Sequence, residues 1–185
     1  MFRKLLNSEL GRPDVEEYKK IEKIPVTVIL DNIRSMHNVG SVFRTCDAFK
    51  IKKIILCGIT STPPNPQIHK SALGAEFSVD WEYEKETIEA IKKLKKEGTA
   101  ILSVEQAVGS TSLEDLWENE VVSKTNIPES KGIALVFGNE VKGVQQEVVN
   151  NSDLCVEIPQ FGTKHSLNIS VSTGVVLWEI MRHYL

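Results

Sequence analysis

The sequence has few cysteines, no long hydrophobic run and no large excess of either charge. Its three cysteines, Cys46, Cys57 and Cys155, are odd in number and widely spaced, and each lies in an apolar stretch. This pattern is typical of reduced core thiols, and it excludes both a disulfide framework and a CxxC metal site. No apolar run reaches the roughly 20 residues that a membrane-spanning helix needs.

The charges are nearly balanced. Lys and Arg number 22 against 25 Asp and Glu, which gives a formal net charge of −3. A general polycation that coats nucleic acid or anionic lipid is therefore excluded, although a local basic patch is compatible with the sequence. The N-terminus lacks the apolar core of a secretory signal, so we expect a cytoplasmic protein. The length of 185 residues and the hydrophobic share of 41% are those of one folded domain.

From residue 25 onward, short apolar runs alternate with helix-like segments. This alternation predicts an α/β fold with a parallel sheet flanked by helices. The strand candidates are residues 26–30, 53–57, 77–83, 99–104, 133–137 and 154–158. The residues that repeat at helical spacing after the first strand are Val39, Val42, Phe43, Cys46 and Phe49. Further helices are predicted over residues 87–97 and about 168–184.

Two other segments carry structural signals. Residues 59–68 contain Pro63, Pro64 and Pro66, which predicts a loop because proline lacks an N–H donor and restricts the preceding residue. Loops after strands often carry ligands. The last helix has more apolar surface than one sheet can cover, which fits either a buried terminal helix or a subunit interface.

Asn38 and Arg44 lie in the first of three polar segments that carry chemistry. Taken alone, an Asn at a helix start is usually a cap, and an Arg on a helix is usually a surface charge. Here, however, Arg44 adjoins the buried stripe at the sheet edge where α/β proteins bind ligands. A guanidinium at that place suits a phosphate or a developing oxyanion.

The second segment is a strand that runs into a turn bracketed by Gly138 and Gly143. Their spacing is that of a P-loop, but Val144 and Gln145 stand where Lys and Ser/Thr are required. Glu140 would also place a negative charge among phosphates. A carboxylate in this turn better suits a cationic ligand or the orientation of an arginine, and a plain tight turn is the alternative.

The third segment places Ser166, Leu167 and Asn168 at the start of the last helix, where either polar residue alone could be only a cap. Together, the three segments would converge at one edge of a parallel sheet. The four histidines have no metal-binding spacing and no serine lies in a GxSxG turn, so metal and serine-hydrolase chemistry are disfavoured.

Taken in order, the three segments resemble the motifs of the SpoU (TrmH) family of RNA ribose 2′-O-methyltransferases, within the SPOUT superfamily. The matching sequences are N-V-G-S-V-F-R at 38–44, F-G-N-E-V-K-G at 137–143 and I-P…S-L-N at 158–168. The resemblance implies a methyltransferase domain over residues 25–185, after an N-terminal extension of residues 1–24. It also implies an S-adenosylmethionine-dependent, metal-free enzyme with a C-terminal trefoil knot, acting as a homodimer with its active site near the interface.

The resemblance assigns roles position by position. The implied cofactor contacts are Gly138, Ile158 and Leu167, and the implied catalytic set is Arg44, Asn38, Glu140, Ser166 and Asn168. A guanidinium resists deprotonation, so we expect Arg44 to hold the target phosphate and stabilise the developing alkoxide rather than act as a base. Glu140 would orient Arg44 or Asn38, while Ser166 and Asn168 would place the ribose and the loop.

The implied partner is RNA. We expect tRNA ahead of rRNA, because larger family members carry a separate N-terminal RNA-binding domain and here only about 24 residues precede the first strand. Those residues either touch RNA as a helix or pack on the domain. The alternatives are a catalytically silent RNA-binding or assembly protein on the same fold and, less favoured, a generic nucleotide-binding domain. The sequence shows no aromatic-rich platform for reading RNA bases.

Overall fold

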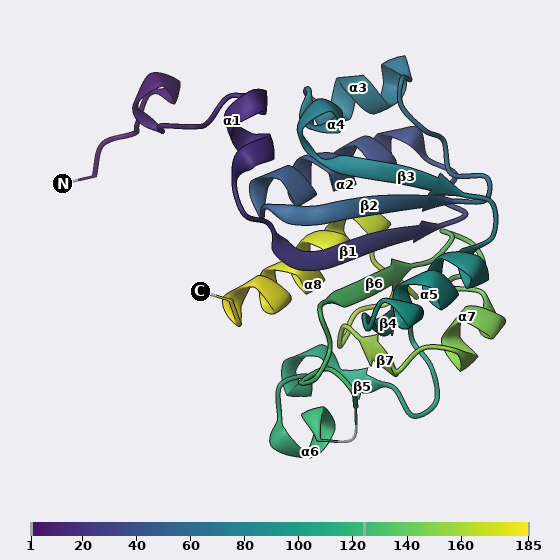
Figure 1. Ribbon diagram of the computed structural model, residues 1–185. Helices are drawn as coiled ribbons and strands as arrows, with labels where there is room; N and C mark the ends of the chain where they lie inside the picture. The colour runs from purple at the N-terminus through teal and green to yellow at the C-terminus, as the bar shows by residue number, and fades with distance from the viewer. Residues whose placement is uncertain (1, 124, 185) are drawn as a thin grey trace.

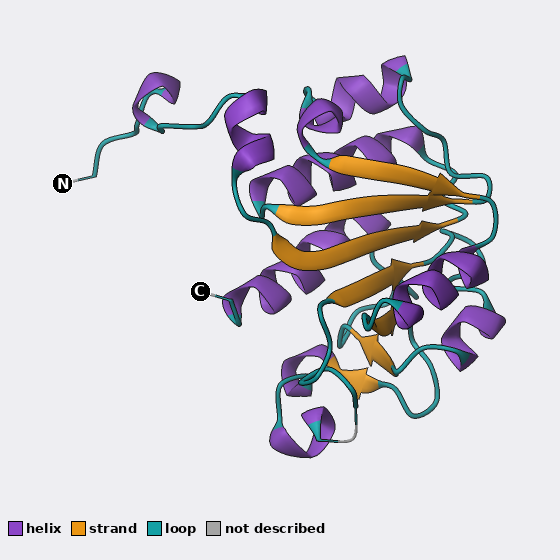
Figure 2. Cartoon of the chain, in the orientation of Figure 1, coloured by secondary structure: helices purple, strands orange, loops and turns teal. Residues whose placement is uncertain are grey.

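A seven-stranded, fully parallel sheet forms the centre of the computed structural model, which describes residues 2–123 and 125–184 (Figures 1 and 2). The strand order is β3-β2-β1-β6-β4-β7-β5. The strands are β1 (Ile24–Asp31), β2 (Ile51–Cys57), β3 (Asp80–Glu84), β4 (Ala100–Val104), β5 (Thr111–Ser112), β6 (Ile133–Phe137) and β7 (Leu154–Glu157). The predicted parallel sheet is confirmed.

Helices cover both faces of the sheet. They are α1 (Val15–Lys20), α2 (Met36–Ala48), α3 (Pro66–Ala72), α4 (Ala75–Ser78), α5 (Thr87–Lys96), α6 (Asn119–Val122), α7 (Gln146–Asn150) and α8 (Ile169–Arg182), with short 3₁₀ turns at Asn7–Glu9 and Leu113–Asp115. The core on one face joins the sheet to α2, α3, α4 and α8, and the core on the other joins it to α5 and α7. Central strands are buried on both faces, which is why they read as continuous apolar runs.

Alternate residues of a strand contribute to the two cores. In β6, Leu135 and Phe137 pack toward α2 and α8, whereas Val136 packs toward α5 and α7. All three side chains are buried. The carboxyl edge of the sheet, where the loops after β1 and β6 begin, therefore lies between two layers of packed helices.

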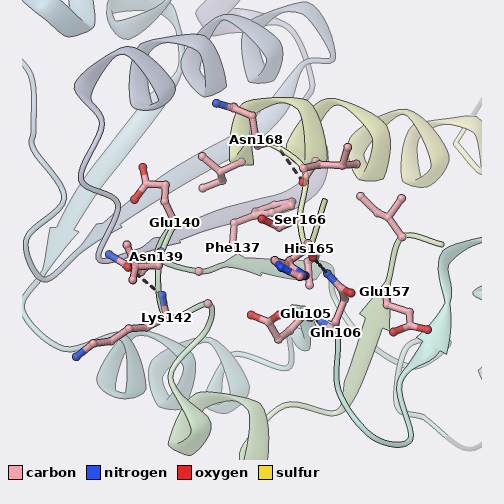
Figure 3. Close-up of a pocket in the computed structure, with 18 of the residues that line it drawn as sticks. Glu105, Gln106, Phe137, Asn139, Glu140, Lys142, Glu157, His165, Ser166 and Asn168 are labelled. Carbon is pink, nitrogen blue, oxygen red and sulfur yellow. Dashed lines mark hydrogen bonds between the residues drawn. The ribbon is translucent and has the colours of Figure 1, made fainter. Parts of the chain in front are cut away.

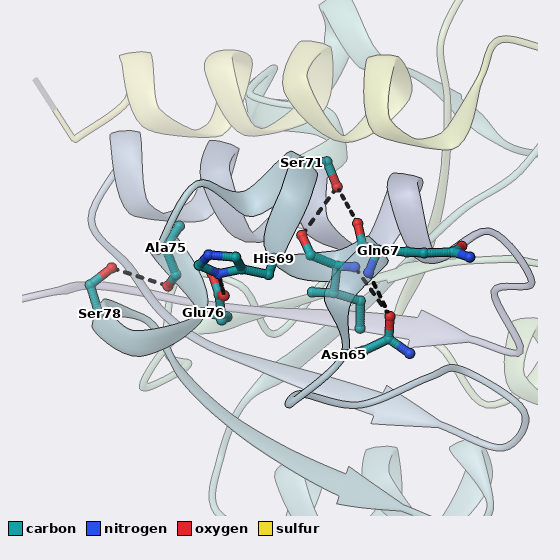
Figure 4. A network of polar contacts seen from close by, with 8 residues as sticks. Asn65, Gln67, His69, Ser71, Ala75, Glu76 and Ser78 are labelled. Atoms are coloured by element: carbon teal, nitrogen blue, oxygen red, sulfur yellow. Dashed lines mark hydrogen bonds and ion pairs between the residues drawn. The ribbon is translucent and has the colours of Figure 1, made fainter.

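The predicted strand over residues 77–83 was wrong at its start. Residues Ala75–Ser78 form α4, and β3 begins at Asp80. The Ser78 hydroxyl donates to the Ala75 carbonyl over 3.1 Å, within that helical turn (Figure 4). A helix of four residues is too short to show the 3.6-residue period, so the apolar Phe77 resembles a strand residue in the sequence.

The predicted loop over residues 59–68 is only partly correct, because α3 begins inside it at Pro66. The Asn65 side chain caps this helix, with Oδ1 accepting from the backbone N–H of Gln67 at 2.9 Å (Figure 4). Proline fits the first helical position because its missing N–H would have no partner there. His69 of α3 pairs with the buried carboxylate of Glu76 in α4 at 2.5 Å, which ties the two helices together.

The N-terminal segment packs on the domain through α1. Tyr18 is buried, and its hydroxyl donates to the Asp47 carbonyl over 3.0 Å. The residues before α1 run away from the body of the molecule (Figure 1). No described helix is long and apolar enough to span a membrane.

Two of the three cysteines occupy the core as predicted. Cys46 and Cys57 are buried, and burial raises the pKa of both thiols, that of Cys57 to about 12. Cys155 departs from the prediction because it is only partly buried, at the sheet edge beside Glu105. Its pKa is also raised, first by desolvation.

Candidate active site

A cavity of about 550 Å³ opens at the carboxyl edge of the sheet, a size typical of ligand pockets (Figure 3). Its walls come from the loops after β4 and β6 and from the loop that connects β7 to α8. Six of the eight site residues predicted from the sequence line it: Gly138, Glu140, Ile158, Ser166, Leu167 and Asn168. Three loops that are distant in the sequence thus meet around one space.

The loop after β6 is a closed turn. Asn139 and Gly143 exchange backbone hydrogen bonds of 3.0 and 2.8 Å. The Asn139 side-chain oxygen also accepts from the backbone N–H groups of Val141 and Lys142. A Cβ on Gly138 would lie 2.0 Å from the backbone nitrogen of Val144. The turn therefore requires glycine at 138, and it presents its backbone to the cavity.

Glu105 supports this turn from below and was missed in the sequence. Its two carboxylate oxygens accept from the backbone N–H groups of Val144 at 2.8 Å and Gln106 at 2.9 Å. Gly143 has φ +69°, and a Cβ there would lie 2.1 Å from Oε2 of Glu105. One signal was available, because Glu105 directly follows the strand predicted at 99–104 and so falls at the same sheet edge.

Glu140 holds the start of α2. Its carboxylate accepts from the backbone N–H groups of Arg34 at 3.1 Å and Ser35 at 3.2 Å, and from Nδ2 of Asn38 at 3.3 Å. Partial burial on its own would raise the pKa of Glu140. These hydrogen bonds and one from its own backbone outweigh that effect, so the pKa lies below its ordinary value.

Asn168 completes this group from the other side of the cavity. Its Nδ2 donates to Oδ1 of Asn38 over 3.2 Å, while its Oδ1 accepts from the backbone N–H of Ser170 and caps α8. The Ser166 hydroxyl lines the cavity and makes no hydrogen bond to any residue in the described part of the chain. Glu140, Asn38 and Asn168 therefore form one chain of hydrogen bonds along the cavity rim.

Arg44 lies elsewhere. It is an exposed residue of α2, six positions after Asn38, and it is not among the residues that line the cavity. Within residues 2–123 and 125–184 its guanidinium makes neither a hydrogen bond nor an ion pair. Of the two partners expected for Glu140, the structure joins it to Asn38 and leaves Arg44 outside the cavity of its own chain.

The charges of the cavity favour a positively charged ligand. Glu105, Glu140 and Glu157 line it and outnumber its one lysine, Lys142, and Glu157 lies across the cavity from Glu140 (Figure 3). The described residues include no group of three or more His, Cys, Asp and Glu side chains arranged to hold a metal ion. The arrangement can thus hold an organic cation against glycine backbone and orient polar groups beside it.

Comparison with known proteins identifies the family. The model of the SpoU rRNA methylase family matches residues 25–178. The chain belongs to this SpoU family. The N-V-G-S-V-F-R, F-G-N-E-V-K-G and S-L-N segments all lie inside the matched region.

SpoU relatives include enzymes that act on two kinds of RNA. A 23S rRNA (guanosine-2′-O-)-methyltransferase of Neisseria meningitidis is 32% identical over 89% of this chain, which spans 61% of that relative's length. A tRNA (guanosine(18)-2′-O)-methyltransferase of Thermus thermophilus is 29% identical over 96% of this chain and 85% of its own length.

Solved SpoU structures share the fold. An AdoMet-bound rRNA methyltransferase of Sinorhizobium meliloti superposes with a TM-score of 0.77 at 28% identity, covering 91% of this chain and 60% of that one. The TrmH/SpoU tRNA-modifying enzyme of A. aeolicus gives a TM-score of 0.75 at 26% identity, with 91% and 79% of the two chains covered.

Proposed function

We propose that this protein transfers a methyl group from S-adenosylmethionine to a ribose 2′-hydroxyl of RNA. The observation that carries the proposal is the hydrogen-bonded chain of Glu140, Asn38 and Asn168, beside a cavity walled by glycine backbone and carboxylates. The activities named for the rRNA and tRNA relatives support the same reaction.

The cavity fits the cofactor. When bound, S-adenosylmethionine supplies an electrophilic methyl group on a cationic sulfur and needs no metal. Gly138, Ile158 and Leu167 would hold it, because the turn at Gly138 leaves no room for a side chain and exposes backbone to the cavity. Glu105 and Glu157 would attract its positive charge.

The polar residues would align the ribose rather than act by strong acid–base chemistry. Glu140 fixes Asn38, and Asn38 and Asn168 together with the free Ser166 hydroxyl would position the ribose for in-line attack. Arg44 would bind the target phosphate and stabilise the negative charge that develops on the 2′-oxygen as this oxygen takes the methyl group and its proton passes to solvent water. A guanidinium stays protonated in proteins, so it acts as a clamp.

Arg44 is exposed and lies outside the cavity of its own chain. This position supports a homodimer in which Arg44 of each chain reaches the cavity of the partner. An apolar groove on α8, lined by Val171, Val175 and Trp178, shares Ile158 with the cavity. These three side chains are 51%, 40% and 51% exposed and form a stripe along the helix. A second copy packed here would place the interface beside the active site.

Several finer features belong to the same proposal. Residues 25–185 would form the methyltransferase domain, with a trefoil knot in its C-terminal part, after an extension of residues 1–24. The start of the family match at residue 25 and the shared fold support this. We favour tRNA over rRNA because the chain spans far more of the tRNA relative than of the rRNA relative. We expect such a protein to act in the cytoplasm.

The test is transfer of tritiated methyl groups from S-adenosylmethionine to total tRNA and, separately, rRNA, followed by nucleoside analysis. We expect a 2′-O-methylated nucleoside from tRNA. Arg44→Lys keeps the charge but loses the two-pronged hydrogen bonding, so we expect about a ten- to hundredfold slower turnover. Arg182→Lys, on the exposed end of α8, is the matched control.

Two results would contradict parts of this proposal. Label in no RNA, despite measurable cofactor binding, would instead support a catalytically silent RNA-binding protein on the same fold. Near-normal turnover of Arg44→Lys would contradict the clamp role of Arg44 while leaving the reaction itself intact.

A further inference from the structure

A second hollow lies along the same edge of the sheet, away from the cofactor cavity. Its lining combines two aromatic rings with hydroxyl and amide groups. The residues are Thr60, Ser61, Thr62, Asn65, Trp81 and Tyr83, and we name it the Trp81–Tyr83 hollow. It joins the edge strand β3 to the loop between β2 and α3, two segments that are about 20 residues apart in the sequence.

The two aromatic side chains project from the same face of β3. Trp81 and Tyr83 are alternate residues of β3 and therefore lie on the same face of the sheet. Trp81 packs partly against the core, and the Tyr83 hydroxyl donates to the Gly58 carbonyl over 3.0 Å. Tyr83 is 50% exposed. The rings are thus held in place while the Tyr83 ring remains open to solvent.

The polar rim of the hollow has free hydrogen-bonding groups. Among the described residues, the hydroxyls of Ser61 and Thr62 have no partner. The Asn65 side chain uses its oxygen to cap α3, and its nitrogen points away from the helix (Figure 4). Pro63 and Pro64 lie between Thr62 and Asn65 and restrict the backbone of this loop, so the loop loses less conformational entropy on binding.

We propose that the Trp81–Tyr83 hollow binds an unstacked nucleobase of the RNA, close to the nucleotide that is methylated. This inference rests on the proposed function, because it takes RNA as the substrate. Single-stranded bases bind proteins by stacking on aromatic rings, and removal of one such ring typically weakens binding by about 1–3 kcal/mol, which is roughly five- to a hundredfold. Free hydroxyl and amide groups suit the edges of a base. The lining has no Lys, Arg, Asp or Glu, so a phosphate or an amino acid is a poorer match.

The position of the hollow fits an RNA strand that reaches both sites. Parallel strands end at the same edge, and β3 lies three places from β6 in the sheet. At roughly 4.8 Å per strand, this separates the two sites by about 14 Å, a span of a few nucleotides.

A chain of contacts connects the two sites. The Thr60 hydroxyl accepts from the Ile33 backbone N–H over 2.9 Å, and the next N–H group, that of Arg34, donates to Glu140. A base in the hollow would therefore contact a loop that is joined directly to the catalytic residues.

The test compares Tyr83→Leu, which removes the π-face, with Tyr83→Phe, which keeps it. For the RNA that the wild type methylates, we expect Tyr83→Leu to raise KM about tenfold, with kcat and cofactor binding unchanged. Tyr83→Phe should stay within about twofold of the wild type. Phe77→Ala removes an exposed ring of α4 outside the hollow, and we expect no effect on KM.

A second measurement does not depend on turnover. RNA that contains 4-thiouridine, irradiated on the folded wild-type protein, should cross-link to the peptide that holds Trp81 and Tyr83. Cross-links only elsewhere, together with an unchanged KM for Tyr83→Leu, would overturn the hollow and leave the methyltransferase intact. Absence of methyl transfer by the wild type would instead overturn the proposed function, and the cross-link would still decide whether the hollow binds RNA.

Discussion

At the residue scale, Glu140 is the point where the loop after β6 meets the start of α2. It accepts hydrogen bonds from two backbone N–H groups and from Asn38, and its pKa is lowered as a result. A carboxylate with a lowered folded-state pKa stabilises the fold at pH values above its unfolded pKa, about 4.3 for glutamate. That stabilisation is lost as the pH falls through the lower, folded-state pKa.

Glu140→Gln should therefore cost stability at pH 7, and the cost should shrink under acid conditions. The difference in free energy of unfolding between wild type and Glu140→Gln is expected to be constant above about pH 5.5 and to fall steadily below it. Urea denaturation at a series of pH values measures it. Glu22→Gln, at an exposed position before β1, controls for removal of a charge. A difference that stays constant down to pH 3 would contradict this account of Glu140.

The sequence predicted the residues that carry side-chain chemistry better than those that support the backbone. Glu140, Asn38 and Asn168 lie in short motifs, and the structure places them in one hydrogen-bonded chain. Glu105 was missed because its partner, the Val144 N–H, is 39 residues further along the chain. Such a contact depends on which loops meet at the sheet edge, and that information is absent from a local motif.

At the scale of elements, the close contact of α2 with α3 depends on Gly40. A Cβ at this position would lie 2.3 Å from the backbone carbonyl oxygen of Ile68 and 2.1 Å from the Ser71 hydroxyl. The carbonyl cannot rotate away as a side chain could, so the helices would have to separate. The glycine in the N-V-G-S motif is thus a packing residue.

Gly40→Ala is expected to destabilise the protein by about 1–3 kcal/mol, the usual cost of overpacking a close contact. Gly162→Ala makes the same change where no atom lies within 4 Å, and its stability should equal or slightly exceed that of the wild type. Thermal and urea unfolding of the two variants provide the comparison. Equal stability of both would show that α3 shifts without cost.

Elements with a clear period were predictable, and short elements fixed by capping were not. The strands β1, β2 and β6 and the helices α2 and α8 follow from apolar patterns. The corner between α3 and α4 depends instead on left-handed backbone at Leu73 (φ 53°) and Gly74 (φ 96°). A leucine gives no sequence signal for that conformation, because it rarely adopts it.

At the scale of the whole molecule, strand order could not be predicted, because β6 pairs with β1 and β4 across long stretches of chain. The partial exposure of α8 is a property of the same scale. Its buried face, formed by Val176, Leu177 and Ile180, packs into the core that α2 shares, while the stripe of Val171, Val175 and Trp178 remains exposed. The sequence left this helix either buried or at an interface, and the structure gives it one buried face and one exposed apolar face.

We expect the wild type to have about twice the mass of a single 20.7 kDa chain in light scattering after size-exclusion chromatography. Val175→Glu places a charge in the exposed stripe of α8 and should give a monomer. Leu73→Glu makes the same change at a leucine that is 66% exposed on the α3–α4 corner, and it should remain a dimer. A dimeric Val175→Glu would contradict the proposed interface.

The exposed position of Arg44 gives the proposed dimer a chemical test. If each chain sends Arg44 to its partner's cavity, a mixed dimer of Arg44→Ala and Glu140→Gln chains contains one cavity with both groups intact. Two inactive variants, unfolded and refolded together, should then regain about a quarter of the wild-type rate, since half of the random pairs are mixed and each has one working site. If Arg44 serves its own cavity, every site carries a defect and mixing restores nothing. The mixture therefore decides which chain supplies the guanidinium.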